Sequence, residues 1–105
     1  LPLDGFIIVA TPQELAKIDA KRSINMVHKM NLPALGIVEN LSGDIFGQGA
    51  GEELAREMNL PFLGRLSLRS SYQDTSKPTV LLDPEVEEEY RLVIKNIQLA
   101  LNKKA

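Results

Sequence analysis

The chain has 105 residues, with 44% hydrophobic and 25% charged side chains, which is the balance of one ordinary globular domain. Its net charge of −2 and the lack of a basic run before the last few residues argue against a nucleic-acid-binding module, and the lack of cysteine excludes disulfides and thiolate metal sites within the chain. Without a signal-peptide pattern, or an apolar run near the roughly 20 residues of a membrane span, we expect a cytoplasmic protein with no membrane span.

The first predicted element is the apolar run at residues 5–10, GFIIVA, which is typical of a strand buried on both faces of a parallel sheet. Because the chain starts without Met and reaches this strand almost at once, we expect it to be part of a longer protein. The following residues predict a helix over 12–30, since Thr11 suits the N-cap, Pro12 the first helical position and Glu14 the capping box.

The helix predicted over 12–30 has an apolar arc that covers about half of its circumference on a helical wheel. The residues of this arc are Leu15, Ala16, Ala20, Ile24, Met26, Val27 and Met30. Asp19 interrupts the arc, and because an unpaired buried acid is costly, we expect it to be paired, at the rim or at an interface. His28, the only histidine, falls on the polar face and is predicted to be a solvated surface residue.

Two similar stretches, MNLPALG at 30–36 and MNLPFLG at 58–64, each predict the end of a helix followed by a strand. Asn tolerates the left-handed conformation at a helix C-terminus, and Pro stops the helix. The pattern predicts strands at 34–40 and 62–68 with a helix at 51–59 between them. Strands separated by helices favour an α/β fold with a parallel sheet and right-handed crossovers.

The last predicted element is a helix that starts at Pro84, with Asp83 as its N-cap. Its apolar stripe consists of Val86, Tyr90, Val93, Ile94, Ile97 and Leu101. Leu92 and Leu99 fall on the opposite face, where they are either solvated or in contact with another part of the protein.

Three glycines, Gly47, Gly49 and Gly51, precede a predicted helix and raise the question of a phosphate-binding loop. The chain contains neither the GxxxxGK[ST] pattern of a P-loop nor the GxGxxG pattern of a dinucleotide site. Glu52 and Glu53, in the first turn of the helix, would also repel a phosphate. The sequence therefore favours glycines that shape a loop and the start of a helix, with a site or mobile element that uses the exposed backbone as the alternative.

Polar residues follow the predicted strands where each strand ends. They are Thr11 after the first strand, Glu39, Asn40 and Ser42 at the second, and the segment 69–77 after the third. Topology brings these three loops to the edge at which open parallel sheets bind ligands. The segment 69–77 is either a surface loop or one wall of a ligand site.

Several stretches of the chain together resemble the C-terminal half of the Mrp-type ATPases, which are relatives of MinD and ParA within the P-loop NTPases. They are DGFIIVATPQELAKIDAKRSINM, LGIVENLS, IFGQGAGEELA, LPFLGRLSL and KPTVLLDP, in order along nearly the whole chain. Many members of this family carry iron–sulfur clusters. The resemblance implies a three-layer, parallel-sheet P-loop NTPase-like fold, with residues 1–105 forming one α/β domain that is the C-terminal portion of a larger nucleotide-binding domain.

The same resemblance implies that the parent protein binds ATP and Mg²⁺ between two subunits of a homodimer, with the P-loop in an N-terminal half. Carried over by position, Asn40 matches the residue that recognises adenine. The residues expected to line the cofactor are Glu39, Asn40, Ser67, Arg69 and Ser70. Gln13 and Asp19 match positions near the dimer interface.

Three departures limit what the resemblance implies. The P-loop and the magnesium ligand of the family lie upstream of Leu1, so we expect this chain alone not to hydrolyse ATP. Carrier members place a CxxC motif where only Gly43 and Asp44 stand here, which excludes a cysteine-ligated cluster in this chain. The family's usual Pro and Asp after the third strand are Ser67 and Arg69, in a shorter loop.

Two alternative functions remain open at this stage. One is a non-enzymatic α/β module that binds a protein partner. The other is a positioning ATPase of the MinD/ParA kind, or a carrier that holds its cargo with other ligands.

Overall fold

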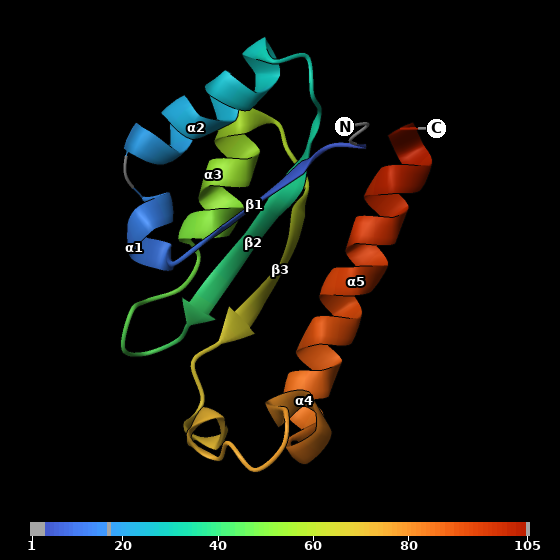
Figure 1. Ribbon diagram of the computed structural model, residues 1–105. Coiled ribbons are helices and arrows are strands. Elements are labelled where there is room, and N and C mark those ends of the chain that lie inside the picture. Colours follow the sequence, from blue (N-terminus) through green and yellow to red (C-terminus); the bar gives the residue numbers. More distant parts are fainter. Residues whose placement is uncertain (1–3, 17, 105) are drawn as a thin grey trace.

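The computed structural model describes residues 4–16 and 18–104 (Figure 1). Its elements in chain order are β1 (Phe6–Ala10), α1 (Pro12–Leu15), α2 (Ile18–Lys29), β2 (Ala34–Ser42), α3 (Ala50–Met58), β3 (Phe62–Ser67), the 3₁₀ turn η1 (Ser70–Gln73), α4 (Thr79–Leu82) and α5 (Pro84–Lys104). No described helix is both long and apolar enough to cross a membrane.

The strands form one sheet in the order β1-β2-β3, and both pairings are parallel. Helices α1, α2 and α3 lie on one face of this sheet and α5 lies on the other, which makes three layers (Figure 1). This arrangement confirms the α/β class and the parallel sheet predicted from the alternation of strands and helices.

Two hydrophobic cores fill the space on either side of the sheet. Beneath α1, α2 and α3 the buried residues are Leu15, Ile24, Ile37, Leu54 and Ala55. Beneath α5 they are Val38, Leu63, Leu66 and Val93. Central strand β2 contributes to both cores because successive side chains of a strand point to opposite faces.

The prediction of one helix over 12–30 is wrong, because α1 ends at Leu15 and α2 begins at Ile18 in a different direction (Figure 1). Lys17 lies outside the described residues. The capping box of Thr11 and Glu14 holds α1 in place, and Leu15 packs beside α3. The apolar arc is split as a result, and Met26 and Met30 are 63% and 58% exposed.

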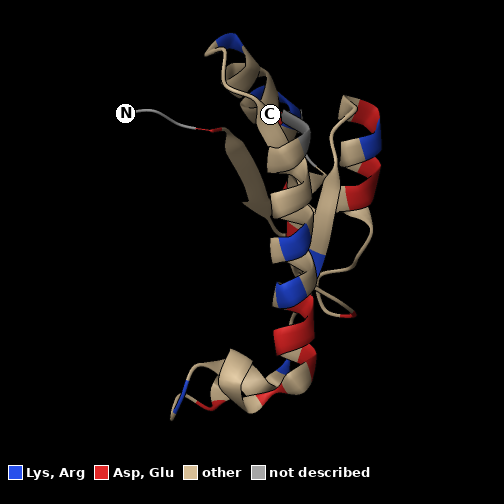
Figure 2. Ribbon diagram, turned by 90° about the vertical axis from the view of Figure 1, so that its right-hand side faces the viewer, with Lys and Arg blue, Asp and Glu red and all other residues tan. Residues whose placement is uncertain are grey.

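Helix α5 packs mainly on β3 and β2, and its apolar stripe is wider than the surface it covers. Val86 and Val93 are buried as predicted, whereas Tyr90 and Ile94 are exposed. Leu92, on the opposite face, is exposed as well. Figure 2 shows acidic residues at the start of α5 and basic residues in the turns that follow, and acidic residues at a helix N-terminus complement the helix dipole.

Both predicted left-handed turns are confirmed, since Asn31 has φ 59° and Asn59 has φ 57°. Each turn lies between a helix and the strand that follows it. The two copies of the MNLP stretch therefore meet the same local need twice, and the chain reverses through an Asn that tolerates positive φ.

Candidate functional site

The C-terminal ends of the three strands meet at one edge of the sheet, at the lower end of the view in Figure 1. The segments that follow the strands are the start of α1, the loop 43–49, and the segment 68–78 that contains η1. The predicted gathering of three strand-end loops at one edge is confirmed. In parallel sheets, this edge is where ligands bind.

Asn40 lies at this edge on the central strand, paired in register with Leu66 of β3. Its side chain is half-buried, and Oδ1 accepts a hydrogen bond from the backbone N–H of Leu41 at 3.0 Å. Among the described residues, the amide Nδ2 of Asn40 has no hydrogen-bond partner. Asn40 therefore presents a free donor and, on Oδ1, one unused lone pair at the ligand edge.

The backbone beyond Asn40 departs from a regular strand. The register with β3 skips from Asn40 to Ser42, and the intervening Leu41 adopts φ 56°. This local irregularity resembles a bulge, a device that redirects a neighbouring side chain and is common beside active sites. A left-handed conformation costs a non-glycine residue on the order of 1 kcal/mol, so the surrounding contacts must hold Leu41 in place.

Leu68 is a residue of this edge that the sequence reasoning did not single out. Its backbone N–H donates to the carbonyl oxygen of Ser42 at 2.9 Å, which holds it beside the bulge. Its side chain is exposed although it is apolar. The signal in the sequence was a Leu between Ser67 and Arg69, two residues predicted to line the cofactor.

Glu39 is fully buried, with 0% of the side chain exposed, and its carboxylate binds inside the protein. Oε2 accepts from Ser42 Oγ at 2.6 Å and from the Gly49 N–H at 3.3 Å, while Oε1 accepts from the Gly51 N–H at 2.8 Å. Burial raises the pKa of Glu39, but these hydrogen bonds and the nearby Arg65 outweigh it and bring the pKa below its usual value.

The glycines near position 49 therefore bind an anion, and the anion is a carboxylate of the same chain. Helix α3 has Gly49 as its N-cap, with φ 100° and no side-chain cap of its own, and the Glu39 carboxylate takes that place. At Gly51 an added Cβ would lie 2.9 Å from Phe62 Cε1 and 3.1 Å from Glu39 Cβ, so a larger residue fits only if these neighbours move. The prediction of glycines that shape a loop and the start of a helix is confirmed.

Arg65 of β3 completes the surroundings of Glu39. Its Nε lies 3.6 Å from Glu39 Oε2 and has no hydrogen-bond partner among the described residues, and its guanidinium forms an ion pair with Glu52. The guanidinium carbon also lies 5.4 Å from the centroid of the Phe62 ring. The charge of Arg65 is thus engaged by two carboxylates of the chain.

Ser67 and Arg69, two of the residues predicted to line the cofactor, are tied to α5. Glu89 accepts from Ser67 Oγ at 2.7 Å and from Ser67 N at 3.2 Å, and its Oε2 lies 3.2 Å from Arg69 Nη2. Arg69 also pairs with Glu85. The hydrogen bond and charge of Glu89 raise the pKa of Arg69, against the effect of burial. Ser70 begins η1 and is exposed.

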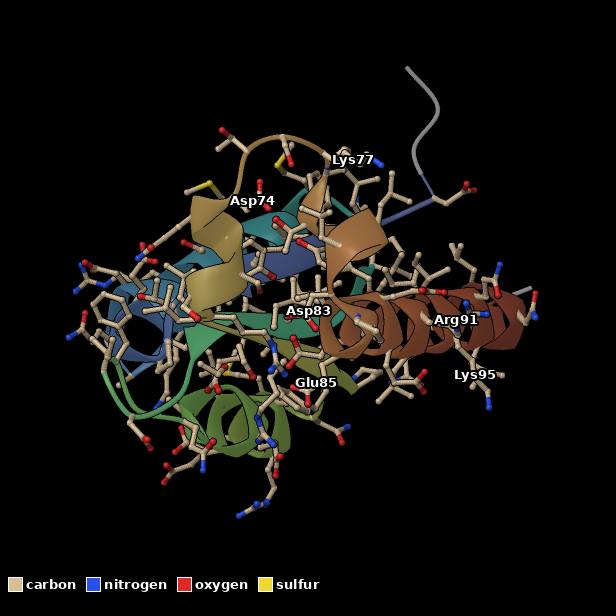
Figure 3. All side chains as sticks on the ribbon, turned by 90° about the horizontal axis from the view of Figure 1, so that it is seen from below. Asp74, Lys77, Asp83, Glu85, Arg91 and Lys95 are labelled. Carbon is tan, nitrogen blue, oxygen red and sulfur yellow. The ribbon has the colours of Figure 1, made fainter. Side chains whose placement is uncertain are left out.

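The start of α5 is linked to the same segment by a second contact. Asp83 Oδ2 accepts from Ser71 Oγ at 2.8 Å, and Oδ1 accepts from the Glu85 N–H at 2.9 Å, as the predicted N-cap requires. Figure 3 shows Asp83 and Glu85 at the start of α5, with Asp74 and Lys77 on the neighbouring loop. The segment 67–71 therefore has a fixed position relative to α5.

Gln13 and Asp19 lie outside this cluster, on the helices that follow β1. Both are exposed, and the Asp19 carboxylate, 84% exposed, lies 3.9 Å from Arg22 Nη1. A hollow of about 330 Å³ separates β1 from α1 and α2 next to Asp19. Of the alternatives stated for Asp19, the structure shows an exposed acid with a weak ion pair, and His28 is exposed as predicted.

No group of three or more His, Cys, Asp or Glu side chains in the described part of the chain could hold a metal ion. The chain has no cysteine, so it offers no thiolate ligand to an iron–sulfur cluster. The strand-end edge presents the Asn40 amide and the exposed Leu68, and the arginines near it are paired with carboxylates. This set fits a neutral planar group with hydrogen-bonding edges better than a bare phosphate or a metal ion.

Comparison with known proteins gives a consistent result. Residues 1–99 match the family model of ParA, described as NUBPL iron-transfer P-loop NTPase. The chain is 42% identical over 108 aligned residues to an iron-sulfur cluster carrier protein of Methanocaldococcus jannaschii, covering 90% of this chain and 37% of the relative. It is 40% identical over 100 residues to an iron-sulfur cluster carrier protein of Escherichia coli K12, covering 83% of this chain and 27% of that protein.

A eukaryotic relative is similar over a shorter stretch. The cytosolic Fe-S cluster assembly factor CFD1 of Candida glabrata is 40% identical over 81 residues, which cover 68% of this chain and 28% of that factor. The chain therefore spans about a third of the length of the curated relatives that it matches.

Proposed function

Because this chain belongs to the ParA family of NUBPL iron-transfer P-loop NTPases, we propose that it is the C-terminal part of an ATP-binding protein that carries or assembles iron–sulfur clusters. In this role it contributes the adenine pocket and part of a dimer surface, while the catalytic phosphate-binding loop lies in an N-terminal half. The similarity to relatives named as iron-sulfur cluster carrier proteins supports the proposal that an iron–sulfur cluster is the cargo.

The observation that carries the proposal is the free amide of Asn40. Adenine presents an N–H donor on N6 next to ring nitrogen acceptors, and an Asn side chain can pair with both at once. In the part of this chain that the structure describes, Asn40 Nδ2 donates no hydrogen bond, and Oδ1 uses only one of its two lone pairs to accept from the N–H of Leu41. Guanine carries an acceptor at position 6 and cannot make the same pair.

The other cofactor-lining residues have different parts in the proposed pocket. Leu68 supplies an apolar contact for the face of the base, while Ser67 and Arg69 keep the segment that bears it fixed to α5. Ser70 borders the pocket from the exposed side. Glu39 is buried behind Asn40, so its role is indirect.

The triphosphate and Mg²⁺ belong to residues outside this chain. Both arginines near the edge, Arg65 and Arg69, are engaged by carboxylates, and phosphoryl transfer requires a positioned Mg²⁺, a Lys and backbone amides together. The N-terminal half pairs with the outer edge of β1. Val9 of β1 is 56% exposed, which is unusual in a parallel sheet and is relieved if more of the protein covers it.

The exposed side of α1 and α2, with Gln13 and Asp19, forms part of the homodimer surface in this proposal. In this proposal the protein acts in the cytoplasm, as the Candida glabrata relative does according to its name, cytosolic Fe-S cluster assembly factor. The cluster is cargo, and because this chain has no cysteine, its ligands lie elsewhere in the protein. If the purified full-length protein binds no iron or sulfide after reconstitution, a positioning ATPase of the MinD/ParA kind is the better assignment.

The test is the nucleotide affinity of full-length protein carrying Asn40→Ala, measured by calorimetry with ATP and GTP in the presence of Mg²⁺. Losing the pair with adenine costs about 1–3 kcal/mol, so ATP affinity falls about 5- to 150-fold while GTP affinity changes little. Asn102→Ala, at an exposed Asn near the end of α5, is the matched control and leaves both affinities unchanged. Unchanged ATP affinity in Asn40→Ala contradicts the proposal and favours a protein-interaction module.

A further inference from the structure

We propose that Glu39 is a positioning residue for base recognition, which holds the bulge at the end of β2 closed and thereby keeps the Asn40 amide directed toward the nucleotide. This inference rests on the proposed function, because it assigns a role in nucleotide selectivity to a side chain that does not touch the nucleotide. The contacts that anchor the Glu39 carboxylate on both sides support this role.

First, a hydrogen bond between Ser42 and Glu39 closes the bulge and acts as a bracket across it. The hydrogen bond from Ser42 Oγ to Glu39 Oε2, at 2.6 Å, joins residues three positions apart and spans Asn40 and Leu41. Inside this bracket Leu41 holds φ 56°, and its N–H fixes the Asn40 side chain through Oδ1. Without the bracket, Leu41 can relax to negative φ, and the N–H that orients Asn40 turns away.

The second step is the anchor on the other side of the carboxylate. The N–H groups of Gly49 and Gly51 bind the two oxygens of Glu39 and tie it to the start of α3. Gly51 is buried, and a Cβ there would force its neighbours to move, so the start of α3 is closely packed around the carboxylate. The bracket to Ser42 is therefore held against a rigid helix end.

The third step is electrostatic. A fully buried carboxylate is stable only when it is well paired, and Glu39 accepts hydrogen bonds from three donors and has Arg65 Nε at 3.6 Å. A buried network of this kind fixes one conformation of its surroundings, because breaking any one of its hydrogen bonds raises the free energy of the protein. The conformation that Glu39 fixes is the one that leaves Asn40 Nδ2 free.

A purely architectural Glu39 explains the same contacts, but it predicts different nucleotide binding. An architectural residue changes the folded fraction and leaves the ratio of ATP to GTP affinity in the folded protein intact. A positioning residue lowers that ratio, and its effect disappears once Asn40 is gone. Ser42 offers a second, milder perturbation, since Ser42→Ala removes the bracket and leaves the Glu39 contacts with Gly49 and Gly51 in place.

The experiment measures ATP and GTP affinities of the full-length protein by calorimetry for Glu39→Gln, Ser42→Ala, Asn40→Ala and the double variants with Asn40→Ala. Asn102→Ala, at an exposed Asn of α5 away from the strand-end edge, is the control. Residues in one hydrogen-bond network couple by enough free energy for an effect of about tenfold. We expect Glu39→Gln and Ser42→Ala each to weaken ATP binding about tenfold, and to change it less than about twofold in the Asn40→Ala background.

Two results overturn the inference and are distinguishable. If Asn40→Ala weakens ATP binding but Glu39→Gln and Ser42→Ala do not, or if their losses are the same with and without Asn40, then Glu39 does not position Asn40 and the proposed function stands. If Asn40→Ala itself leaves ATP affinity unchanged, the proposed function fails and the inference fails with it. Because Ser42→Ala keeps the anchor on α3, it provides the comparison if Glu39→Gln folds poorly.

Discussion

Replacing Gly51 by Ala sets two physical effects of opposite sign against each other. In the interior of a helix, Ala is favoured over Gly by about 0.5–1 kcal/mol, so the exchange stabilises a helix with room for a methyl group. Here the added Cβ would stand 2.9 Å from Phe62 Cε1, 3.1 Å from Glu39 Cβ and 3.3 Å from Leu15 Cδ1. Extra atoms in a packed site cost about 1–3 kcal/mol.

Because three neighbours on different elements would have to move, we expect the steric effect to prevail, with a net loss of roughly 1–2 kcal/mol in the free energy of unfolding. Urea denaturation followed by circular dichroism measures this loss. As an internal check, Gly51→Ala should cost less in a Phe62→Leu background, because Leu lacks the nearest ring atom, and the difference should be at least about 0.5 kcal/mol. A Gly51→Ala variant as stable as the wild type, or more stable, refutes the close approach.

The remaining predictions concern the charges and caps at the strand-end edge. Glu89→Ala removes the acceptor of Ser67 and should lower the free energy of unfolding by about 1–3 kcal/mol in urea denaturation. Glu88→Ala, at the exposed neighbouring residue, should change the free energy of unfolding by no more than about 0.5 kcal/mol. Equal effects of the two variants would contradict the network around Glu89. Thr11→Ala removes the capping box of α1 and should cost about 1 kcal/mol, and no loss would mean that the box is dispensable. Because the pKa of Glu39 is lowered in the folded state, its charged form stabilises the fold fully above the unfolded pKa of about 4.3. This contribution is lost as the pH falls through the folded pKa, so the difference in unfolding free energy between wild type and Glu39→Gln should be full at pH 7 and shrink in acid. A difference that stays constant with pH would contradict this prediction.

Features set by neighbouring residues were predictable from the sequence. Thr11 and Glu14 form the capping box that their spacing of three predicts, and Asn31 and Asn59 adopt the left-handed turns that their position before a Leu-Pro pair predicts. The parallel order of the strands followed from alternation with helices. In each case the decisive contacts lie within a few residues along the chain.

Features set by contacts between distant residues were not predictable. No local pattern indicates that Glu39 caps α3 through Gly51, twelve positions away, or that Glu89 binds Ser67, twenty-two positions away. The break between α1 and α2 was not predicted for the same reason, because it depends on how Leu15 of α1 and Ile24 of α2 pack against distant residues of β2 and α3 in the same core. The position of Asn40 was predicted, but the bulge that orients it depends on these distant contacts.

The most direct measurement of the central claim is a structure of the full-length protein with Mg²⁺ and a non-hydrolysable ATP analogue. We predict that the adenine lies at the C-terminal edge of β2, with the Asn40 amide within about 2.7–3.2 Å of N6 and a ring nitrogen of the base. The Glu39 carboxylate should keep its hydrogen bonds with Ser42 and Gly51 in that complex. An adenine bound elsewhere, with Asn40 not in contact with it, would contradict the account.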